Sequence, residues 1–326
     1  MNKINWGIIG CGDVTEVKSG PAFNKVKNSA LVAVMRRDLS KAKDYALRHD
    51  VPVWYDDGLK LINDPGVSAV YIATPPSSHE EYALASIKAG KPVYVEKPMT
   101  LNYASALRIK NAAKENKVKL SIAHYRRAQP FFKKIKELLD DKAIGEISVV
   151  QLSYFKESLS AAELKMPGIR WRVDKAISGG GLFHDLAPHQ LDLMYYFFGE
   201  VQEVNGISFN QEKAYTADDI VGGNILFKNG VLFSGIWSFN VGSECERDHC
   251  EIIGSEGKIS FSVFGPQEIL ITKNGAPEII AFTRPEHVQQ PMIEKVVEYF
   301  LGEGPNPCSA EDGAEVMRLM ERFTSQ

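Results

Sequence analysis

Short apolar runs alternate with helical patterns from the N-terminus to about residue 124. The runs expected to be strands are Ile4–Ile9, Leu31–Met35, Ala69–Ala73, Val93–Val95 and Val118–Ala123. Nearly all their residues are apolar, as is typical of parallel strands that helices cover on both faces. Between them, helices are expected over residues 79–89, with Ser78 as the N-cap, and from about Thr100 onward. This alternation predicts an α/β domain with a doubly wound parallel sheet.

The pattern changes after Pro130. A helix is expected over residues 131–139, a strand over 147–155 and, after the glycine run at 179–181, a helix through 185–197. From Val201 to about Ile271, long strands joined by turns are expected, and helices over 292–300 and 310–322 follow them. The second half therefore predicts an α+β domain with a large, open, mostly antiparallel sheet and helices on one side.

Two segments of this second half mark hairpin turns, namely Lys228-Asn229-Gly230 and Lys273-Asn274-Gly275. Asn and Gly tolerate the positive φ angles that tight hairpin turns require. Beyond the first turn, the apolar side chains that share one face of the predicted strand are Val231, Phe233, Trp237 and Phe239.

A length of 326 residues predicts about two domains. We expect a dinucleotide-binding domain over residues 1–124 and a domain for substrate binding and oligomerisation over 125–326. The net charge of −3, from 38 Lys and Arg against 41 Asp and Glu, argues against nucleic-acid or anionic-membrane binding. No apolar run has the roughly 18 residues that a membrane span needs. The first ten residues do not resemble a signal peptide, and four scattered cysteines suit a reducing cytoplasm.

A glycine loop follows the first strand, with the sequence Gly10-Cys11-Gly12-Asp13-Val14-Thr15. Glycines there let the backbone turn tightly and approach a dinucleotide pyrophosphate, as in Rossmann domains, although an ordinary βα turn has the same appearance. Thr15 stands where a third glycine is usual, so looser packing is expected there. Gly20-Pro21 interrupts the helix that follows, which is expected to restart at Pro21.

The end of the second strand indicates which dinucleotide binds. Arg36 stands where NAD-binding domains usually carry an acid, with Arg37 beside it. A guanidinium suits the 2′-phosphate of NADP, so NADP is favoured. The alternative is that Asp38 binds the ribose of NAD and both arginines are solvated.

Glu96-Lys97-Pro98 follows the buried strand over 93–95. Ligands of open α/β sheets bind at the carboxyl ends of the strands, so Lys97 is expected to face the cofactor crevice and polarise a substrate oxygen. The alternative is a surface lysine in a loop.

In the helix after the glycine run, Asp185, His189 and Asp192 fall at i, i+4 and i+7 and therefore share one face. An imidazole held by a carboxylate is a candidate proton donor and acceptor near neutral pH. A surface ion pair, a buried structural histidine and a metal site are the alternatives. His184 lies elsewhere on the helix, where a structural role is expected. Cys245 and Cys250, with His249 between them, lack a second ligand pair, so no metal is predicted.

These motifs, in this order and spacing, resemble the Gfo/Idh/MocA oxidoreductase family over nearly the whole length. The residues that carry the resemblance are Gly10-Cys11-Gly12, Ala73-Thr74-Pro75-Pro76 with His79, Glu96-Lys97-Pro98, and Gly179-Gly180-Gly181 with Asp185 and His189. Met35 and Arg36 are similar to the branch that includes 1,5-anhydro-fructose reductase and the dihydrodiol and xylose dehydrogenases.

The resemblance implies a Rossmann domain followed by an open-sheet domain, with Lys97 as the catalytic lysine and Asp185 and His189 as the acid/base pair. It places along the cofactor the residues Gly10, Cys11, Gly12, Asp13, Val14, Arg36, Arg37, Thr74, Pro75, His79, Glu96, Lys97 and Arg127. It places in the substrate pocket Tyr125, Trp171, Arg172 and Asp192.

The expected function is NADP-linked hydride transfer to or from a cyclic sugar or polyol. The active site would need Lys97 from the first domain and His189 from the second. The rival hypotheses are a non-catalytic NAD(P)-binding regulator and an enzyme that uses transient oxidation to cleave a glycosidic bond. An uncovered face of the large sheet would favour a homodimer or homotetramer.

Overall fold

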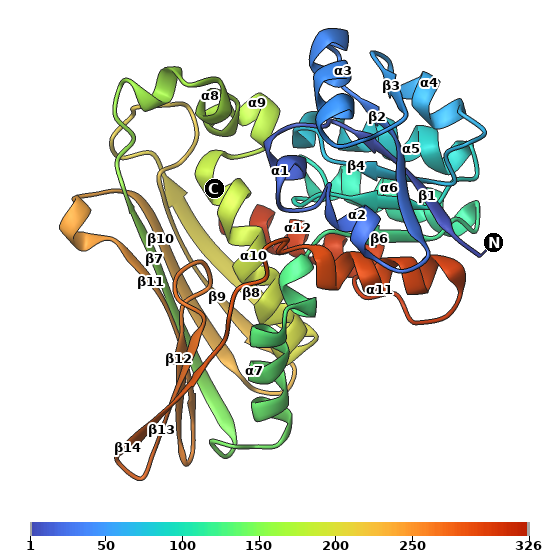
Figure 1. Cartoon of the computed structure of the whole chain (residues 1–326). Helices are drawn as coiled ribbons and strands as arrows, with labels where there is room; N and C mark the ends of the chain where they lie inside the picture. The colour runs from blue at the N-terminus through green and yellow to red at the C-terminus, as the bar shows by residue number, and fades with distance from the viewer. Residues whose placement is uncertain (1, 325–326) are drawn as a thin grey trace. The chain divides into compact units, whose positions relative to one another are not determined.

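The computed structural model describes residues 2–324, whose strands form a six-stranded and an eight-stranded sheet (Figure 1). Two compact units contain them. The first runs to Gln129 and includes Pro285–Met317, and the second combines Pro130–Arg284 with the segment from Arg318. The chain thus returns to the first unit after residue 284, a return that a linear division at residue 124 does not describe. The two predicted architectures, a parallel α/β domain and a mostly antiparallel α+β domain, are confirmed.

The six-stranded sheet is parallel and has the order β3-β2-β1-β4-β5-β6. Its strands are β1 (Ile4–Ile9), β2 (Ser29–Met35), β3 (Val53–Tyr55), β4 (Ala69–Ile72), β5 (Val93–Val95) and β6 (Leu120–Ile122). The strand order reverses between β1 and β4, and ligands of doubly wound sheets bind at such a switch point, outside the carboxyl ends of the strands. The loops after β1, β4 and β5 are therefore neighbours at this edge.

Short helices connect these strands. They are α1 (Asp13–Glu16), α2 (Ala22–Lys25), α3 (Leu39–Arg48), α4 (Gly58–Asn63), the 3-10 turn η1 (Pro76–Ser78), α5 (His79–Lys88), α6 (Tyr103–Glu115) and η2 (Tyr125–Ala128). Ser78 precedes α5 as predicted, but its hydroxyl donates to Thr74 and Pro75 and does not cap the helix. Asn102 is the residue that caps α6, through its side-chain bond to the Ser105 amide.

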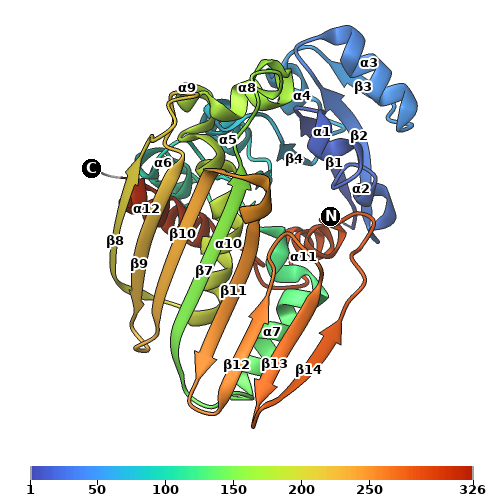
Figure 2. The same ribbon diagram turned by 90° about the vertical axis from the view of Figure 1, so that its left-hand side faces the viewer.

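The eight-stranded sheet has the order β14-β13-β12-β11-β7-β10-β9-β8, and its strands lie side by side in Figure 2. They are β7 (Ile147–Glu157), β8 (Val201–Phe209), β9 (Ile220–Phe227), β10 (Leu232–Val241), β11 (Arg247–Gly254), β12 (Gly257–Phe261), β13 (Glu268–Lys273) and β14 (Ala276–Ala281). All its pairs are antiparallel except β10 with β7.

The remaining helices and 3-10 turns are α7 (Pro130–Asp140), η3 (Glu163–Lys165), α8 (Pro167–Val173), α9 (Lys175–Ser178), α10 (Gly181–Phe198), η4 (Ser243–Cys245), α11 (Gln290–Leu301) and α12 (Ala310–Thr324). Helices α7 and α10 lie behind the large sheet in Figure 2 and cover one of its faces. Trp237 is fully buried on that face between Phe183 and Phe323, at ring-centroid distances of 5.2 and 5.8 Å. No helix within residues 2–324 is long and apolar enough to cross a membrane.

The two predicted hairpin turns differ in geometry. Asn274 and Gly275 both take positive φ, 55° and 79°, as a two-residue turn requires. At the other turn Gly230 has a φ of 88°, whereas Asn229 keeps an ordinary φ and its side chain accepts from the Val231 amide. The first turn therefore uses positive φ only at its glycine, and both predicted turns do join antiparallel strands.

The segment after residue 284 packs against the glycine-loop side of the first unit. His287 Nδ1 lies 2.6 Å from the Val17 carbonyl, and the Gln289 amide donates to the Lys18 carbonyl at 3.1 Å. Gln129 donates its side-chain amide to the Val288 carbonyl at 3.0 Å. These contacts integrate α11 into the first unit although it follows the last strand of the second.

Candidate active site

The glycine loop passes very close to the loop after β4. Gly10 has a φ of +95°, and a Cβ built on it would lie 2.7 Å from the Thr74 backbone nitrogen. Only glycine fits there, because both the backbone angle and the space exclude a side chain. The contact brings the predicted cofactor residues Gly10 and Thr74 together at the carboxyl edge of neighbouring strands.

Gly12 has a different reason to be glycine. Apart from its two chain neighbours, the nearest atom to a Cβ on it would be the Gly10 carbonyl oxygen at 4.0 Å, so the backbone faces open space. This opening fits a dinucleotide, whose pyrophosphate needs a close approach to the backbone of this loop. Asp13 and Val14 follow on α1, exposed and half-buried respectively. Cys11 is buried, which raises the pKa of its thiol to about 11.

The helix after the loop breaks as predicted. Helix α1 has only four residues, and α2 begins at Ala22 directly after Pro21. The expected loose packing at Thr15 is wrong, because Thr15 is fully buried and its carbonyl accepts from the Tyr45 hydroxyl at 2.8 Å. A Cβ on Gly20 would lie 2.2 Å from that same Tyr45 oxygen, so the tight packing moves to Gly20.

Arg36 follows β2 and is half-buried, and its Nη1 donates to the Cys11 carbonyl at 3.3 Å. This bond holds the guanidinium beside the glycine loop. Arg37 is exposed. Asp38 caps α3 by accepting from the Ser40 and Lys41 amides, and the Ser40 hydroxyl lowers the pKa of this carboxyl. In the alternative hypothesis Asp38 binds a ribose, but this carboxylate already accepts the hydrogen bonds that cap α3.

The His79 imidazole connects the loop after β4 to the loop after β5. It is fully buried, with Nε2 2.7 Å from the Thr74 carbonyl and Nδ1 3.0 Å from the Pro98 carbonyl. Burial lowers the pKa of the imidazole. His79 therefore links the half-buried Thr74-Pro75 segment to the segment that carries Lys97.

Lys97 is half-buried immediately after β5, and its backbone amide donates to Glu96 Oε2 at 3.0 Å. The buried Glu96 carboxylate also accepts at Oε1 from the Tyr71 hydroxyl and from Gln289 Nε2, both at 2.5 Å. Burial and this negative charge raise the pKa of Tyr71. Glu96 thus fixes the Lys97 backbone to β4 and to the segment before α11, and sequence spacing gave no sign of Gln289.

Tyr125 and Arg127 lie on η2, both buried. Arg127 pairs with Asp312 at 3.3 Å, so part of its charge is balanced within the first unit. Tyr125 lies with its ring centroid 5.6 Å from the Arg126 guanidinium.

In the second unit, Asp185, His189 and Asp192 all lie on α10, as the spacing predicts. His189 and Asp192 are buried and Asp185 is half-buried. The expected structural role of His184 agrees with its burial, which lowers the pKa of its imidazole to about 4.

Each of the three glycines before α10 is required for a different structural reason. Gly179 ends α9 with a φ of 94°. A Cβ on Gly180 would lie 2.1 Å from His184 Nδ1, and one on Gly181, whose φ is +75°, would lie 2.5 Å from the Ala217 Cβ. The three glycines allow a tight approach to α10 and so place the face that carries Asp185.

Arg172 is the partner of Asp185 that the spacing did not reveal. Its Nε donates to Asp185 Oδ2 at 3.0 Å, and its Nη1 donates to the Gly168 carbonyl. The guanidinium lies over the Trp171 ring, 4.5 Å from the ring centroid. The predicted substrate residues Trp171 and Arg172 therefore form a cluster with Asp185, built by the short helix α8, which the sequence pattern did not predict.

Phe264, which the sequence analysis did not single out, packs against His189. Their ring centroids are 5.7 Å apart with an interplanar angle of 74°. Phe264 lies in a turn between β12 and β13, and no sequence motif connects that turn to α10.

Cys250 is buried on β11 and Cys245 is exposed, and both are free thiols. Within residues 2–324, no group of three or more His, Cys, Asp or Glu side chains is arranged to hold a metal ion.

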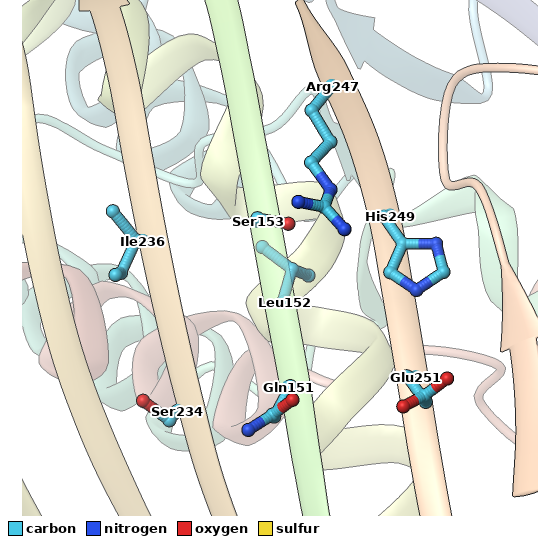
Figure 3. A pocket seen from close by; sticks show the side chains of 8 residues that line it. All are labelled: Gln151, Leu152, Ser153, Ser234, Ile236, Arg247, His249 and Glu251. Atoms are coloured by element: carbon cyan, nitrogen blue, oxygen red, sulfur yellow. The ribbon is translucent and has the colours of Figure 1, made fainter. Parts of the chain in front are cut away.

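A hollow of about 370 Å³ opens on the face of the large sheet that α7 and α10 leave uncovered (Figure 3). Its lining comes from three adjacent strands and consists of Gln151, Leu152, Ser153, Ser234, Ile236, Arg247, His249 and Glu251. It contains none of the predicted catalytic or cofactor residues.

These features define a two-unit oxidoreductase with a dinucleotide-binding parallel sheet. The family described as "Oxidoreductase family, NAD-binding Rossmann fold" matches residues 4–124, and the GFO/IDH/MocA C-terminal domain matches residues 132–260. The chain belongs to the Gfo/Idh/MocA oxidoreductase family, as the motifs predict.

Three similar proteins illustrate the relationship. Oxidoreductase P35 of Formosa agariphila is 49% identical to this chain, and the alignment covers 99% of this chain and 98% of the length of P35. The scyllo-inositol 2-dehydrogenase (NADP(+)) IolW of Bacillus subtilis is 29% identical, covering 67% of this chain and 58% of its own. A solved structure of levoglucosan dehydrogenase with NADH and levoglucosan shares the fold, with a TM-score of 0.86, 22% identity, and coverage of 98% of this chain and 96% of its own.

Proposed function

We propose that this protein is an NADP-preferring dehydrogenase or reductase that acts on the CH–OH group of a cyclic sugar or polyol. The observation that carries the proposal is the placement of Lys97, half-buried at the carboxyl end of β5 with its backbone fixed by Glu96. In a Rossmann domain the cofactor crevice is expected at that edge of the sheet, so an ammonium there would lie beside the cofactor.

Two groups act on the reacting oxygen. In the reducing direction, the Lys97 ammonium donates a hydrogen bond to the substrate carbonyl and stabilises the negative charge that grows on its oxygen. His189 delivers the proton to that oxygen and, in the oxidising direction, accepts it. Asp185 orients His189, and its bond to Arg172 keeps this carboxylate on the substrate side of α10. When bound, the nicotinamide supplies or accepts the hydride.

NADP is the proposed cofactor, and NAD is the alternative. The open backbone at Gly12 would receive the pyrophosphate, and Arg36 would pair with the 2′-phosphate. The placement of Arg36 beside the Cys11 carbonyl supports this role, as does the capping role that occupies Asp38. The relative named for NADP(+) agrees with this preference, while the levoglucosan dehydrogenase structure holds NADH.

The substrate class is argued from the polar side chains on α8 and α10 and from the names of relatives. A polyol needs several fixed hydrogen-bond partners. Asp192 lies on α10 with the proposed proton donor, and Arg172, on α8, bonds to Asp185 of that same helix. Tyr125 is the proposed partner from the first unit. Relatives named for inositol and levoglucosan suggest a ring substrate.

A non-catalytic NAD(P)-binding regulator would not need Lys97, Asp185 and His189 together, and their presence favours an enzyme. An enzyme that cleaves glycosidic bonds by transient oxidation would regenerate its cofactor. Net accumulation of NADPH or NADP during turnover therefore separates the two enzymatic hypotheses.

We also propose that the enzyme self-associates in the cytoplasm as a dimer or tetramer. Large apolar side chains are exposed on three strands of the eight-stranded sheet, namely Ile207, Phe209, Leu232, Ile236 and Ile279. A second copy would bury such a surface. The four cysteines, which form no disulfide in the described part of the chain, suit a reducing compartment.

The test is a screen of the purified protein against sugars and polyols with both cofactors, followed by NADPH absorbance. We expect turnover with a cyclic substrate and a preference for NADP(H). Cofactor binding without turnover of any sugar or polyol would contradict the proposal.

A further inference from the structure

A short turn between β12 and β13, residues 262–265, is held by side-chain hydrogen bonds on both sides. The carboxylate of Asp248, on β11, accepts from three successive backbone amides, those of Val263, Phe264 and Gly265, at 3.1, 2.6 and 2.8 Å. The Ser262 hydroxyl donates to the Asp248 carbonyl at 2.8 Å. Asp248 therefore sets the path of the whole turn.

Arg284 holds the opposite side of the same turn. Its Nη2 donates to the carbonyls of Phe264 and Gly265, at 2.7 and 2.8 Å. An acid thus binds the amides and a guanidinium binds the carbonyls of one short segment. Charge-assisted bonds of this kind are stronger than neutral ones, so the turn has little freedom to move.

The side chain that this turn presents is Phe264. Its ring lies edge-to-face with the His189 imidazole, and its centroid is 5.1 Å from that of Tyr154. Phe264 is half-buried while His189 is buried, so Phe264 keeps some exposure to solvent beside the proposed proton donor.

We propose that Phe264 is a specificity-determining residue that selects a rigid ring substrate, an inference that rests on the proposed function. A pyranose or cyclitol ring has a face of C–H groups that packs on an aromatic ring while its hydroxyls point to polar partners. An open-chain polyol has no such fixed face and loses conformational entropy on binding. Phe264 therefore favours the ring and holds its oxygen near His189.

Asp248 and Arg284 are positioning residues in this account, because they act through the backbone of Phe264. Substitution of either residue should move the Phe264 ring and so raise KM for ring substrates, as removal of that ring does. Asp248→Asn keeps the size of the side chain but removes the charge that binds three amides.

The test compares ring substrates, pyranoses and cyclitols, with the open-chain hexitols sorbitol and mannitol. KM and kcat are measured separately in the unmodified enzyme and in Phe264→Leu, Phe264→Tyr, Asp248→Asn and Asp248→Asn/Phe264→Leu. Phe209→Leu is the matched control, because Phe209 lies on β8, at the other end of the sheet order from β12 and β13.

We expect Phe264→Leu to raise KM for ring substrates roughly three- to tenfold, the range of a lost aromatic contact, with a smaller change for hexitols. Phe264→Tyr should retain the ring preference, and Phe209→Leu should leave the ratio of KM values for rings and hexitols unchanged. Asp248→Asn should shift the ring preference in the same direction. The double variant should be no worse than Phe264→Leu alone, since Asp248 acts through that ring.

Equal losses for rings and chains, or effects of Asp248 and Phe264 that add in full, would overturn the assignment while the proposed function stands. A preference of the unmodified enzyme for hexitols would do the same. Absence of turnover with every sugar and polyol would instead contradict the proposed function, and this inference with it.

Discussion

Arg36 and Arg37 are adjacent arginines with different surroundings, and this difference makes the cofactor assignment testable. Arg36 is half-buried and bonded to the glycine loop, whereas Arg37 is exposed. Arg36→Asp should reverse the preference for NADP(H), with a loss of about 2 kcal/mol, or thirtyfold in affinity, from the missing charge-assisted pair. Binding titrations of both cofactors measure it.

Arg37→Asp is the matched control and should leave the ratio of the two affinities within a few-fold. Equal affinity of the unmodified protein for NADP(H) and NAD(H) would contradict the role given to Arg36.

His184 predicts a pH dependence of stability. Burial lowers the pKa of its imidazole from 6.5 to about 4. Between those values the unfolded chain binds a proton that the folded chain does not, so the free energy of unfolding falls as the pH is lowered through this range. The loss approaches roughly 3 kcal/mol at the acid end.

Urea unfolding at several pH values between 7 and 4 measures this loss. In His184→Asn the slope of the free energy of unfolding against pH should be smaller. An unchanged slope would mean that His184 is not the group responsible.

The placement of individual residues was predictable where one motif carries them. The placement of Lys97 after a buried strand and of three polar side chains on one helix face follows from local spacing alone. Gln289 and Phe264 could not be found this way, because each contacts its partner across a large separation in sequence.

At the scale of elements, the turn before α10 depends on Gly180 for a steric reason. Its φ of 176° lies outside the left-handed region that favours glycine. The new Cβ would nevertheless lie 2.1 Å from the buried His184 ring. Gly180→Ala should therefore lower the free energy of unfolding by about 1–3 kcal/mol, the usual cost of overpacking.

The double variant Gly180→Ala/His184→Ala separates this cause from others. Adding Gly180→Ala to His184→Ala should cost much less than adding it to the unmodified protein, as thermal unfolding would measure. A full cost in both backgrounds would show that the ring is not what excludes a side chain.

Most elements of regular pattern were predictable, and the exceptions have physical causes. Strand β3 has only three residues, and Val53 at its start is exposed, so its apolar signal is weak. Helix α8 contains Arg170, Trp171 and Arg172 and buries only Val173, so no amphipathic period marks it. No local sequence pattern indicates that the segment after residue 284 belongs to the first unit.

At the scale of the whole molecule, the uncovered face of the large sheet predicts self-association. Ile236 is 50% exposed on β10, an interior strand that lies third from the β8 edge of the sheet. Ile236→Lys should lower the mass measured by light scattering toward that of one 36.2 kDa chain, because a charge opposes burial of this surface. A monomeric mass for the unmodified protein would contradict the proposed assembly.

The central claim is that Lys97 and His189, one from each unit, act on the same substrate oxygen. Substitution of His189 by alanine should lower kcat, and Asp185→Asn should lower it less. The effects of the Lys97 and His189 substitutions should not add in full, because both groups stabilise one transition state. This coupling is the whole-molecule consequence of the mechanism.

The most direct test is kcat of Lys97→Met on the substrate found by the screen, with the dissociation constant of NADP(H) measured alongside. The account predicts a fall in kcat of about 10²–10⁴-fold, the usual contribution of a positioned acid–base or electrostatic group, with cofactor affinity unchanged within a few-fold. Near-normal kcat in this variant would show that Lys97 is structural and that the proposed mechanism is wrong.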